Sequence, residues 1–230
     1  MAVAQAVLEL PGGNEGALDA GFYAIAWPRR AGCRGGGVVT ALLAPRSGLV
    51  LTNAQFEAMM RKGAFTTIGR VELRRGSITP MSTVYFLHAA ALFELTQALL
   101  ASLKQGGLRL KVLNCVALGL GEGFQPVADL VVYDPAWAPP DLEGPLPKEA
   151  VRLVVEVAGA SLGDELGDKA REYARAGVAE YWVLDAKGQV VTQYALPSSR
   201  GYAEHKAVPL SRPLVSSTLP VTLDLAALAG

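Results

Sequence analysis

The chain has 230 residues, which is enough for one domain of ordinary size with a substantial core. Hydrophobic residues make up 51% and charged residues 18%, so the composition excludes an intrinsically disordered chain. The formal net charge is zero, which argues against strong non-specific binding to nucleic acid through many phosphate contacts. Residues 1–111 carry 12 basic and 6 acidic side chains, and residues 112–230 carry 9 and 15. This asymmetry fits either separate basic and acidic faces or a chance scatter of solvated charges.

The first 50 residues differ in composition from the rest of the chain. They contain the glycine-rich stretches PGGNEG and AGCRGGGVV, and no helical or strand period persists through them. We therefore expect residues 1–50 to form a loosely packed N-terminal extension and residues 51–230 to form the folded domain.

Several features favour a cytoplasmic protein. The N-terminus lacks the basic and long apolar segments of a signal peptide, and Cys33 and Cys115 show no disulfide or metal-ligand spacing. The longest apolar stretch, FLHAAALFELTQALLASL, is interrupted by His88 and Glu94, so we expect no membrane span.

The elements expected after Leu51 alternate between helices and strands. A helix is expected to begin at Thr52, which has capping-box spacing to Gln55, and a longer apolar helix is expected from Thr83 to about Lys104. Strands are expected around an Arg75–Gly76 turn and over 107–120, 124–135, 151–157 and 180–185, with a hairpin at 187–188 leading into 189–196. A further helix over 164–176 is expected to close at Gly177. This order predicts an α/β fold of the α+β type, with a mixed sheet flanked by helices.

Two of the predicted strands each carry one carboxylate among valines and leucines. Asp129 lies in VADLVVY and Glu156 in VRLVVEV. A lone carboxylate buried there would cost several kcal/mol unless something pairs with it. If the two strands are neighbours, both carboxylates can bind one Mg²⁺ ion, which accepts such ligands together with waters and substrate phosphates. Lys169, thirteen residues after Glu156, could reach the pair from the following helix, and this combination suits attack on a phosphodiester.

The stretches VELRRGSITPM, PVADLVVY, LVVEVAGAS and DKAREYARAGVAEYWVLD carry a resemblance to a known family. From about Leu51 to the C-terminus, the chain resembles the Uma-type endonucleases of the PD-(D/E)XK nuclease superfamily. The resemblance implies a restriction-endonuclease-like core, a Mg²⁺-dependent (or Mn²⁺-dependent) endonuclease activity on DNA, and nucleic acid and a second copy of the chain as partners.

The resemblance also implies a set of site residues. Asp129 and Glu156 would be metal ligands, with the carbonyl of Val157 completing the set, and Glu72 would supply a further acidic group. Lys169 would replace the motif lysine that usually stands two residues after the glutamate, since that position holds Ala158. Two further departures are present: Pro126 precedes Asp129 by three residues instead of one, and Gly-Ala-Ser at 159–161 replaces Ser-Pro-Ser.

Two other functions are compatible with the sequence. GASLG at 159–163 fits the G-x-S-x-G pattern between a strand and a helix, so Ser161, Asp185 and His205 could form the triad of an α/β-type serine hydrolase. A nuclease fold that has lost catalysis and only binds nucleic acid or protein is the other alternative. His88 and the aromatic residues Tyr173, Tyr181 and Trp182 are expected to be core residues.

Overall fold

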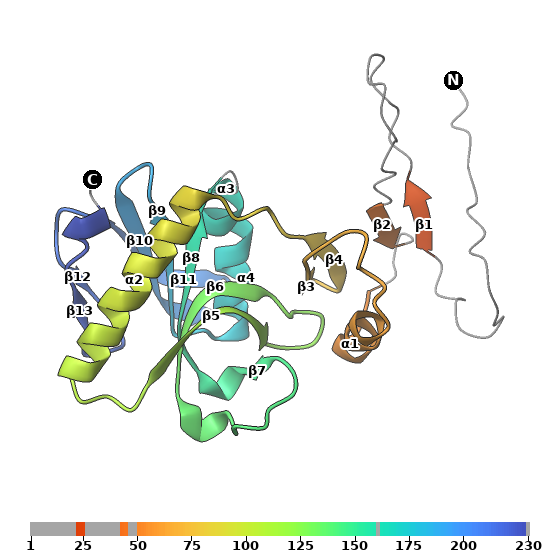
Figure 1. Ribbon diagram of the computed structural model, residues 1–230, viewed down its shortest axis with the longest axis horizontal. Helices are drawn as coiled ribbons and strands as arrows, with labels where there is room; N and C mark the ends of the chain where they lie inside the picture. Colours follow the sequence, from red (N-terminus) through yellow and green to blue (C-terminus); the bar gives the residue numbers. More distant parts are fainter. Residues whose placement is uncertain (1–21, 26–41, 46–49, 160–161, 229–230) are drawn as a thin grey trace, which may run out of the picture. The chain divides into compact units, whose positions relative to one another are not determined.

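The computed structural model describes residues 22–25, 42–45, 50–159 and 162–228. The chain divides into two units, Met1–Ser82 with Glu122–Phe124, and Thr83–Gly121 with Gln125–Gly230 (Figure 1). In the first unit, β1 (Phe22–Ile25) pairs antiparallel with β2 (Leu42–Pro45), two strands that the sequence did not predict. The other residues of the predicted extension lie outside the described residues, except Val50, so its loose packing stays a prediction.

The rest of the first unit follows the predicted local signals. Helix α1 (Asn53–Arg61) begins at the N-cap Thr52, whose side chain accepts from the Gln55 amide while the Gln55 side chain accepts from the Thr52 amide. Strands β3 (Val71–Arg74) and β4 (Ser77–Pro80) form a hairpin, and both turn residues, Arg75 and Gly76, have positive φ. The small hydrophobic core of the first unit contains Leu51, Phe56, Phe65, Val71 and Leu73. The predicted helix and hairpin are confirmed.

The second unit is built on a seven-stranded sheet with the order β11-β10-β9-β8-β6-β5-β7. Its strands are β5 (Lys111–Gly119), β6 (Val127–Tyr133), β7 (Leu146–Pro147), β8 (Val151–Ala158), β9 (Glu180–Asp185), β10 (Val190–Ser198) and β11 (Gly201–Pro209). The β8–β9 and β5–β7 pairs are parallel and the others are antiparallel. The predicted mixed sheet with flanking helices is therefore confirmed.

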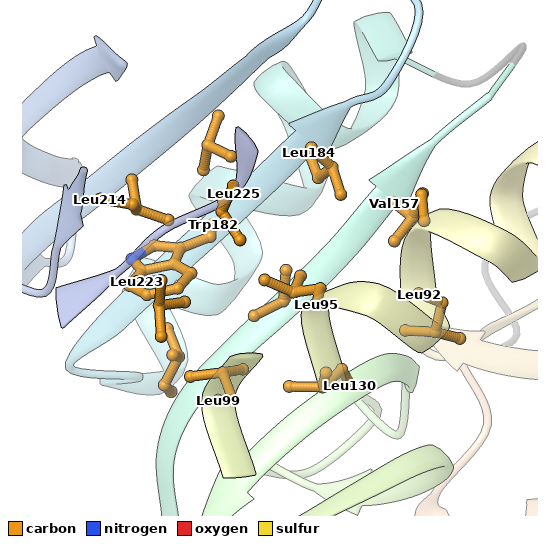
Figure 2. Close-up of a cluster of buried hydrophobic side chains, with 14 of the residues drawn as sticks. Leu92, Leu95, Leu99, Leu130, Val157, Trp182, Leu184, Leu214, Leu223 and Leu225 are labelled. Atoms are coloured by element: carbon orange, nitrogen blue, oxygen red, sulfur yellow. The ribbon is translucent and has the colours of Figure 1, made fainter. Parts of the chain in front are cut away.

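Helix α2 (Phe86–Gln105) packs across one face of this sheet. Its buried residues are Ala91, Leu92, Leu95, Leu99 and Leu103, and they join the main core with residues of β6, β8 and β9 (Figure 2). By length and composition α2 could also cross a membrane, but a core helix of a soluble protein meets the same test. The helix begins three residues later than predicted, at a Tyr85 N-cap that makes no side-chain hydrogen bond.

A second helical segment covers the opposite face of the sheet (Figure 1). It runs through α3 (Leu162–Asp164), a single π-helical turn η3 (Glu165–Lys169) and α4 (Ala170–Ala176), and it ends at Gly177, whose φ of 81° gives the predicted left-handed cap. Along β8, Leu153, Val155 and Val157 belong to the core under α2. Because strand side chains alternate between faces, Glu156 projects to the side of α4.

Shorter elements complete the second unit. They are the 3₁₀ turns η1 (Pro135–Trp137), η2 (Lys148–Ala150) and η4 (Ala226–Leu228), and the two-stranded pair β12 (Leu214–Val215) and β13 (Thr222–Leu223). Leu214 and Leu223 reach the main core, so the C-terminal segment packs against the same sheet (Figure 2).

Candidate active site

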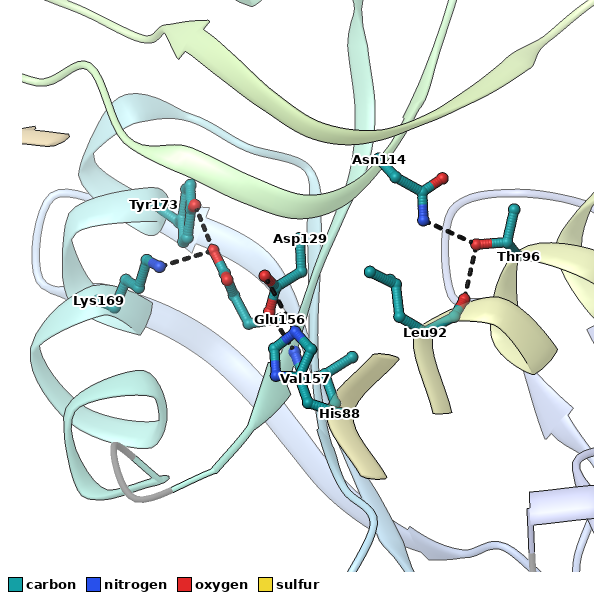
Figure 3. A network of polar contacts seen from close by, with 9 residues as sticks. All are labelled: His88, Leu92, Thr96, Asn114, Asp129, Glu156, Val157, Lys169 and Tyr173. Atoms are coloured by element: carbon teal, nitrogen blue, oxygen red, sulfur yellow. Dashed lines mark hydrogen bonds and ion pairs between the residues drawn. The ribbon is translucent and has the colours of Figure 1, made fainter. Parts of the chain in front are cut away.

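Glu156 is buried in the middle of the sheet, with 2% of its surface exposed. Its Oε1 atom accepts a hydrogen bond from the Tyr173 hydroxyl at 2.7 Å and lies 2.9 Å from the Lys169 Nζ atom (Figure 3). Both partners come from the helical segment that follows β8. The carboxylate in the apolar strand is thus compensated by a cation and a hydroxyl, as its burial requires.

The π-helical turn positions these two partners. Lys169 is the last residue of the turn and Tyr173 follows four residues later in α4, so both side chains lie on the helix face that meets β8. A π turn contains one more residue than an α turn, and such turns are frequent at functional sites. Lys169 is buried to a degree that is rare for lysine, with 7% of its surface exposed.

Asp129 lies on β6, the antiparallel neighbour of β8. The register pairs Leu130 with Val155, so its continuation by one residue places Asp129 opposite Glu156. The Asp129 Oδ2 atom accepts from the Val157 amide at 2.9 Å, and the Oδ1 atom lies 3.3 Å from His88 Nε2 at the start of α2 (Figure 3).

The sheet is irregular at Asp129 on its other side as well. In the β5–β6 register, the residue opposite Asp129 is Cys115, which is exposed, makes no ladder pair and has a φ of 54°. A positive φ is uncommon for a residue other than glycine. Neither neighbouring strand pairs regularly with β6 at Asp129. The Val157 amide, which has no backbone acceptor on β6, therefore donates its hydrogen bond to the Asp129 carboxylate.

Burial and neighbouring groups shift the pKa values of the two carboxyl groups in opposite directions. Burial raises the pKa of Glu156 to about 8, a rise that the Lys169 charge opposes and the Asp129 charge reinforces. Burial would also raise the pKa of Asp129, but hydrogen bonds from His88 and the Val157 amide, with the charges of His88 and Lys169, outweigh it and lower that pKa below its usual 3.8. The pair therefore carries one negative charge more readily than two.

The donor set fits a hard divalent cation that keeps most of its waters. Both polar contacts of Glu156 fall on Oε1. The Val157 amide points toward β6, and its carbonyl points to the same side because the two groups of a strand residue share a direction. Among the described residues, no group of three or more His, Cys, Asp or Glu side chains is gathered as a metal cage. Two carboxylates and a carbonyl match the way Mg²⁺ binds, with waters and substrate phosphates as its other ligands.

Four of the five predicted site residues come together, and the sequence missed two others. Asp129, Glu156, Val157 and Lys169 meet between β6, β8 and η3. Glu72 lies buried on β3 of the first unit, 3.9 Å from Arg74 on the same strand, and its role at the site stays a prediction. Tyr173 is buried, as predicted for a core residue, but its hydroxyl also contacts Glu156, and His88, expected to be a core residue, contacts Asp129. Only the four-residue spacing of Tyr173 from Lys169 could have indicated the first.

The serine hydrolase alternative loses its Asp–His pair. The registers of β9, β10 and β11 place His205 level with Tyr181, four residues from Asp185, which is about 13 Å along the strand. The Asp185 carboxylate instead accepts from the Gly188 amide at 2.8 Å in the turn after β9. Ser161 lies outside the described residues.

Comparisons with known proteins identify the family of the chain and agree with its fold. A family model described as "Uma2: Putative restriction endonuclease" matches residues 54–228. Among solved structures, a putative nuclease belonging to DUF820 from Anabaena variabilis has a similar fold, with a TM-score of 0.52, 16% sequence identity, and coverage of 69% of this chain and 90% of that chain. A comparison with curated proteins finds no match. The chain belongs to the Uma2 family of putative restriction endonucleases.

Proposed function

We propose that the protein is a metal-dependent endonuclease of the PD-(D/E)XK type that hydrolyses phosphodiester bonds of DNA in the cytoplasm. The observation that carries the proposal is the buried contact between Glu156 and Lys169 beside Asp129. A stable fold has no need of a buried carboxylate and ammonium, because well-packed apolar residues are often as stable or more stable in such places. The proposal includes Glu72 as a further acidic group, Mn²⁺ as an alternative to Mg²⁺, and a homodimeric assembly.

The residues of the chain divide the work of hydrolysis. A bound Mg²⁺ would lower the pKa of a water and neutralise charge on the scissile phosphate. Asp129, Glu156 and the Val157 carbonyl would hold the ion, and the Val157 amide and the Tyr173 hydroxyl fix the orientation of the two carboxyl groups. Lys169 places its ammonium where it can orient the attacking water and stabilise the negative charge that develops on the phosphate. Lys169 thus takes over, from a helix, the task of a lysine that would stand at Ala158.

Plasmid cleavage with Mg²⁺ or Mn²⁺ titrated into the chelator-treated protein tests this proposal. We expect cleavage to depend on the metal and Lys169→Ala to lower its rate by roughly 10²–10³, the usual loss for one electrostatic stabiliser. Lys187→Ala is the matched control, because Lys187 is an exposed lysine in the β9–β10 turn. We also expect Ser161→Ala to cleave normally, since no step uses that hydroxyl.

Two outcomes would contradict the proposal. An unchanged rate in Lys169→Ala would show that this lysine has no catalytic role. Metal binding without cleavage of any DNA substrate would favour the binding-module alternative, in which the same fold has lost catalysis.

A further inference from the structure

The outer edge of β11 has no strand partner among the residues that the structure describes. β11 pairs with β10 from Pro209 opposite Val190 to Glu204 opposite Ala195, and again at Tyr202 and Gly201; the pair between them is missing where Leu196 has a φ of 58°. Its central residues, 203–207, are all exposed. A long exposed edge strand carries unpaired amides and carbonyls that can pair with another chain.

The backbone groups on the outer edge belong to alternate residues. The Leu210 amide donates to the Gln189 carbonyl at 3.0 Å, which marks that pair as the hydrogen-bonded kind. Because such pairs alternate with non-bonded ones in an antiparallel ladder, the pairs of His205 with Tyr194 and of Ala207 with Thr192 are non-bonded. His205 and Ala207 therefore point their amides and carbonyls away from β10.

The charges on β11 are self-complementary about His205. Glu204 and Lys206 stand on either side of it and project to one face, while the His205 ring stacks on Tyr194 at the other face, with ring centroids 5.8 Å apart. We propose that β11 pairs antiparallel with β11 of a second copy of the chain, about a two-fold axis at His205. Glu204 then faces Lys206 of the second copy, and Lys206 faces Glu204.

The backbone and the side chains select the same register. With the axis at His205, its amide and carbonyl bond to those of His205 in the second copy, and Glu204 and Lys206 form non-bonded pairs, in which Cα atoms approach to about 4.5 Å. An axis at Glu204 would oppose two glutamates, and an axis at Lys206 would oppose two lysines. The charges that protect an edge strand from indiscriminate pairing thus disfavour the neighbouring registers and favour this one.

The resulting interface is isologous, as two-fold dimers require. Ala203 and Ala207 face each other across it, and their small side chains leave the two backbones free to approach. The inference concerns the sheet edge alone, so it stands whether or not the protein cleaves DNA.

Sedimentation of the full chain over a range of concentrations tests the proposal. We expect the wild type to form a species of twice the 24.1 kDa chain mass. Glu204→Lys and Lys206→Glu should each raise the dissociation constant about tenfold or more, because each turns two attractive pairs into repulsive ones. The double variant carrying both reversals should restore the wild-type value, and an equimolar mixture of the two single variants should form a heterodimer.

Charge reversal elsewhere provides the control. Glu94→Lys on α2 and Lys187→Glu in the β9–β10 turn change the net charge by the same amounts at exposed positions away from β11, so both should dimerise like the wild type. A wild type that stays monomeric at every concentration would overturn the proposal. A dimer that neither β11 reversal weakens would overturn it equally, since another surface such as the exposed face of α2 would then hold the two copies together.

Discussion

At the scale of single residues, the two central carboxylates and Lys169 were predictable, and the other two partners, Tyr173 and His88, were not. Asp129 and Glu156 stand among apolar neighbours, where a buried charge is unfavourable unless another group compensates it. Tyr173 and His88 belong to residue types that are ordinary on the buried face of a helix, so their sequence context did not distinguish a core residue from one that contacts a carboxylate. The distinction depends on where two distant segments meet, which a local pattern does not contain.

The acidity of Glu156 predicts how stability varies with pH. Its pKa in the folded protein, about 8, lies above the ordinary value of 4.5, so the folded state retains a proton that the unfolded state releases between these values. Stability should therefore be highest below about pH 4.5 for this group and fall as the pH rises toward 8. Urea unfolding at pH 5 and pH 8.5, in the presence of a chelator, measures the fall. Glu156→Gln should reduce this fall in the free energy of unfolding, and Glu94→Gln, an exposed control, should not. An equal fall in the wild type and both variants would contradict the raised pKa of Glu156.

The Tyr173 hydroxyl should contribute to stability in addition to the packing of its ring. Tyr173→Phe keeps the packing but removes the 2.7 Å hydrogen bond to a fully buried carboxyl group. We expect the free energy of unfolding to fall by about 1–3 kcal/mol, the cost of leaving a buried polar group unsatisfied. Tyr85→Phe, at a position that is 76% exposed, is the control and should change little. A loss of the same size in both variants would mean that the hydrogen bond to Glu156 contributes nothing specific.

At the scale of elements, regular periodicity was predictive and irregular elements were not. The helices α1 and α2 and the strands β6, β8 and β9 follow clear apolar patterns. Strand β11 lacked one, because an edge strand exposed on both sides has no apolar face to reveal it. The π-helical turn was hidden for a different reason: it adds one residue within a helix without changing the residue types that a helix favours.

One buried carboxylate, that of Glu180, gathers several hydrogen bonds from the C-terminal segment. Glu180, with none of its surface exposed, accepts hydrogen bonds from Trp182, Ser216 and Thr218 side chains and from the amides of Ser217 and Thr218. Glu180→Gln replaces an acceptor oxygen with a donor that faces other donors. We expect a loss of several kcal/mol of stability, as for breaking a buried charged network.

Hydrogen exchange would locate this effect. Amides of residues 216–225 should lose protection in Glu180→Gln before those of β6 and β8 do, if the carboxylate attaches the segment. Glu143→Gln, at an exposed position in the loop before β7, serves as the matched control. Uniform loss of protection across the sheet would show that Glu180 supports the whole core and not this segment.

At the scale of the whole molecule, the order of elements predicted the class of fold but not the order of strands in the sheet. Helix, strands, helix and strand indicated a mixed sheet with helices packed on it, and the sheet shows that architecture. The matched carboxylates of Asp129 and Glu156 indicated that β6 and β8 are neighbours, but the rest of the strand order follows from long-range packing that no local signal encodes. The division into two units was also not predicted.

Divalent cations should stabilise the folded protein by binding at the Asp129–Glu156 site. A ligand that binds only the folded state at 100 times its dissociation constant adds about 2.7 kcal/mol. We therefore expect Mg²⁺ or Mn²⁺ to raise the melting temperature of the wild type and to leave that of Asp129→Asn nearly unchanged. Asp224→Asn, an exposed aspartate near the C-terminus, is the control and should respond like the wild type. Equal stabilisation of all three proteins would place the ion elsewhere.

The positions of Glu156 and Lys169 on different elements affect how the protein can fold while it is being synthesised. Strand β8 leaves the ribosome before the helical segment that compensates its carboxylate. Until Lys169 and Tyr173 have emerged, burying β8 would bury a carboxyl group with neither its cation nor its hydroxyl partner, and such a state is strongly disfavoured. We therefore expect the centre of the sheet to assemble only after residue 173 has emerged, when β8, the π turn and α4 are all available.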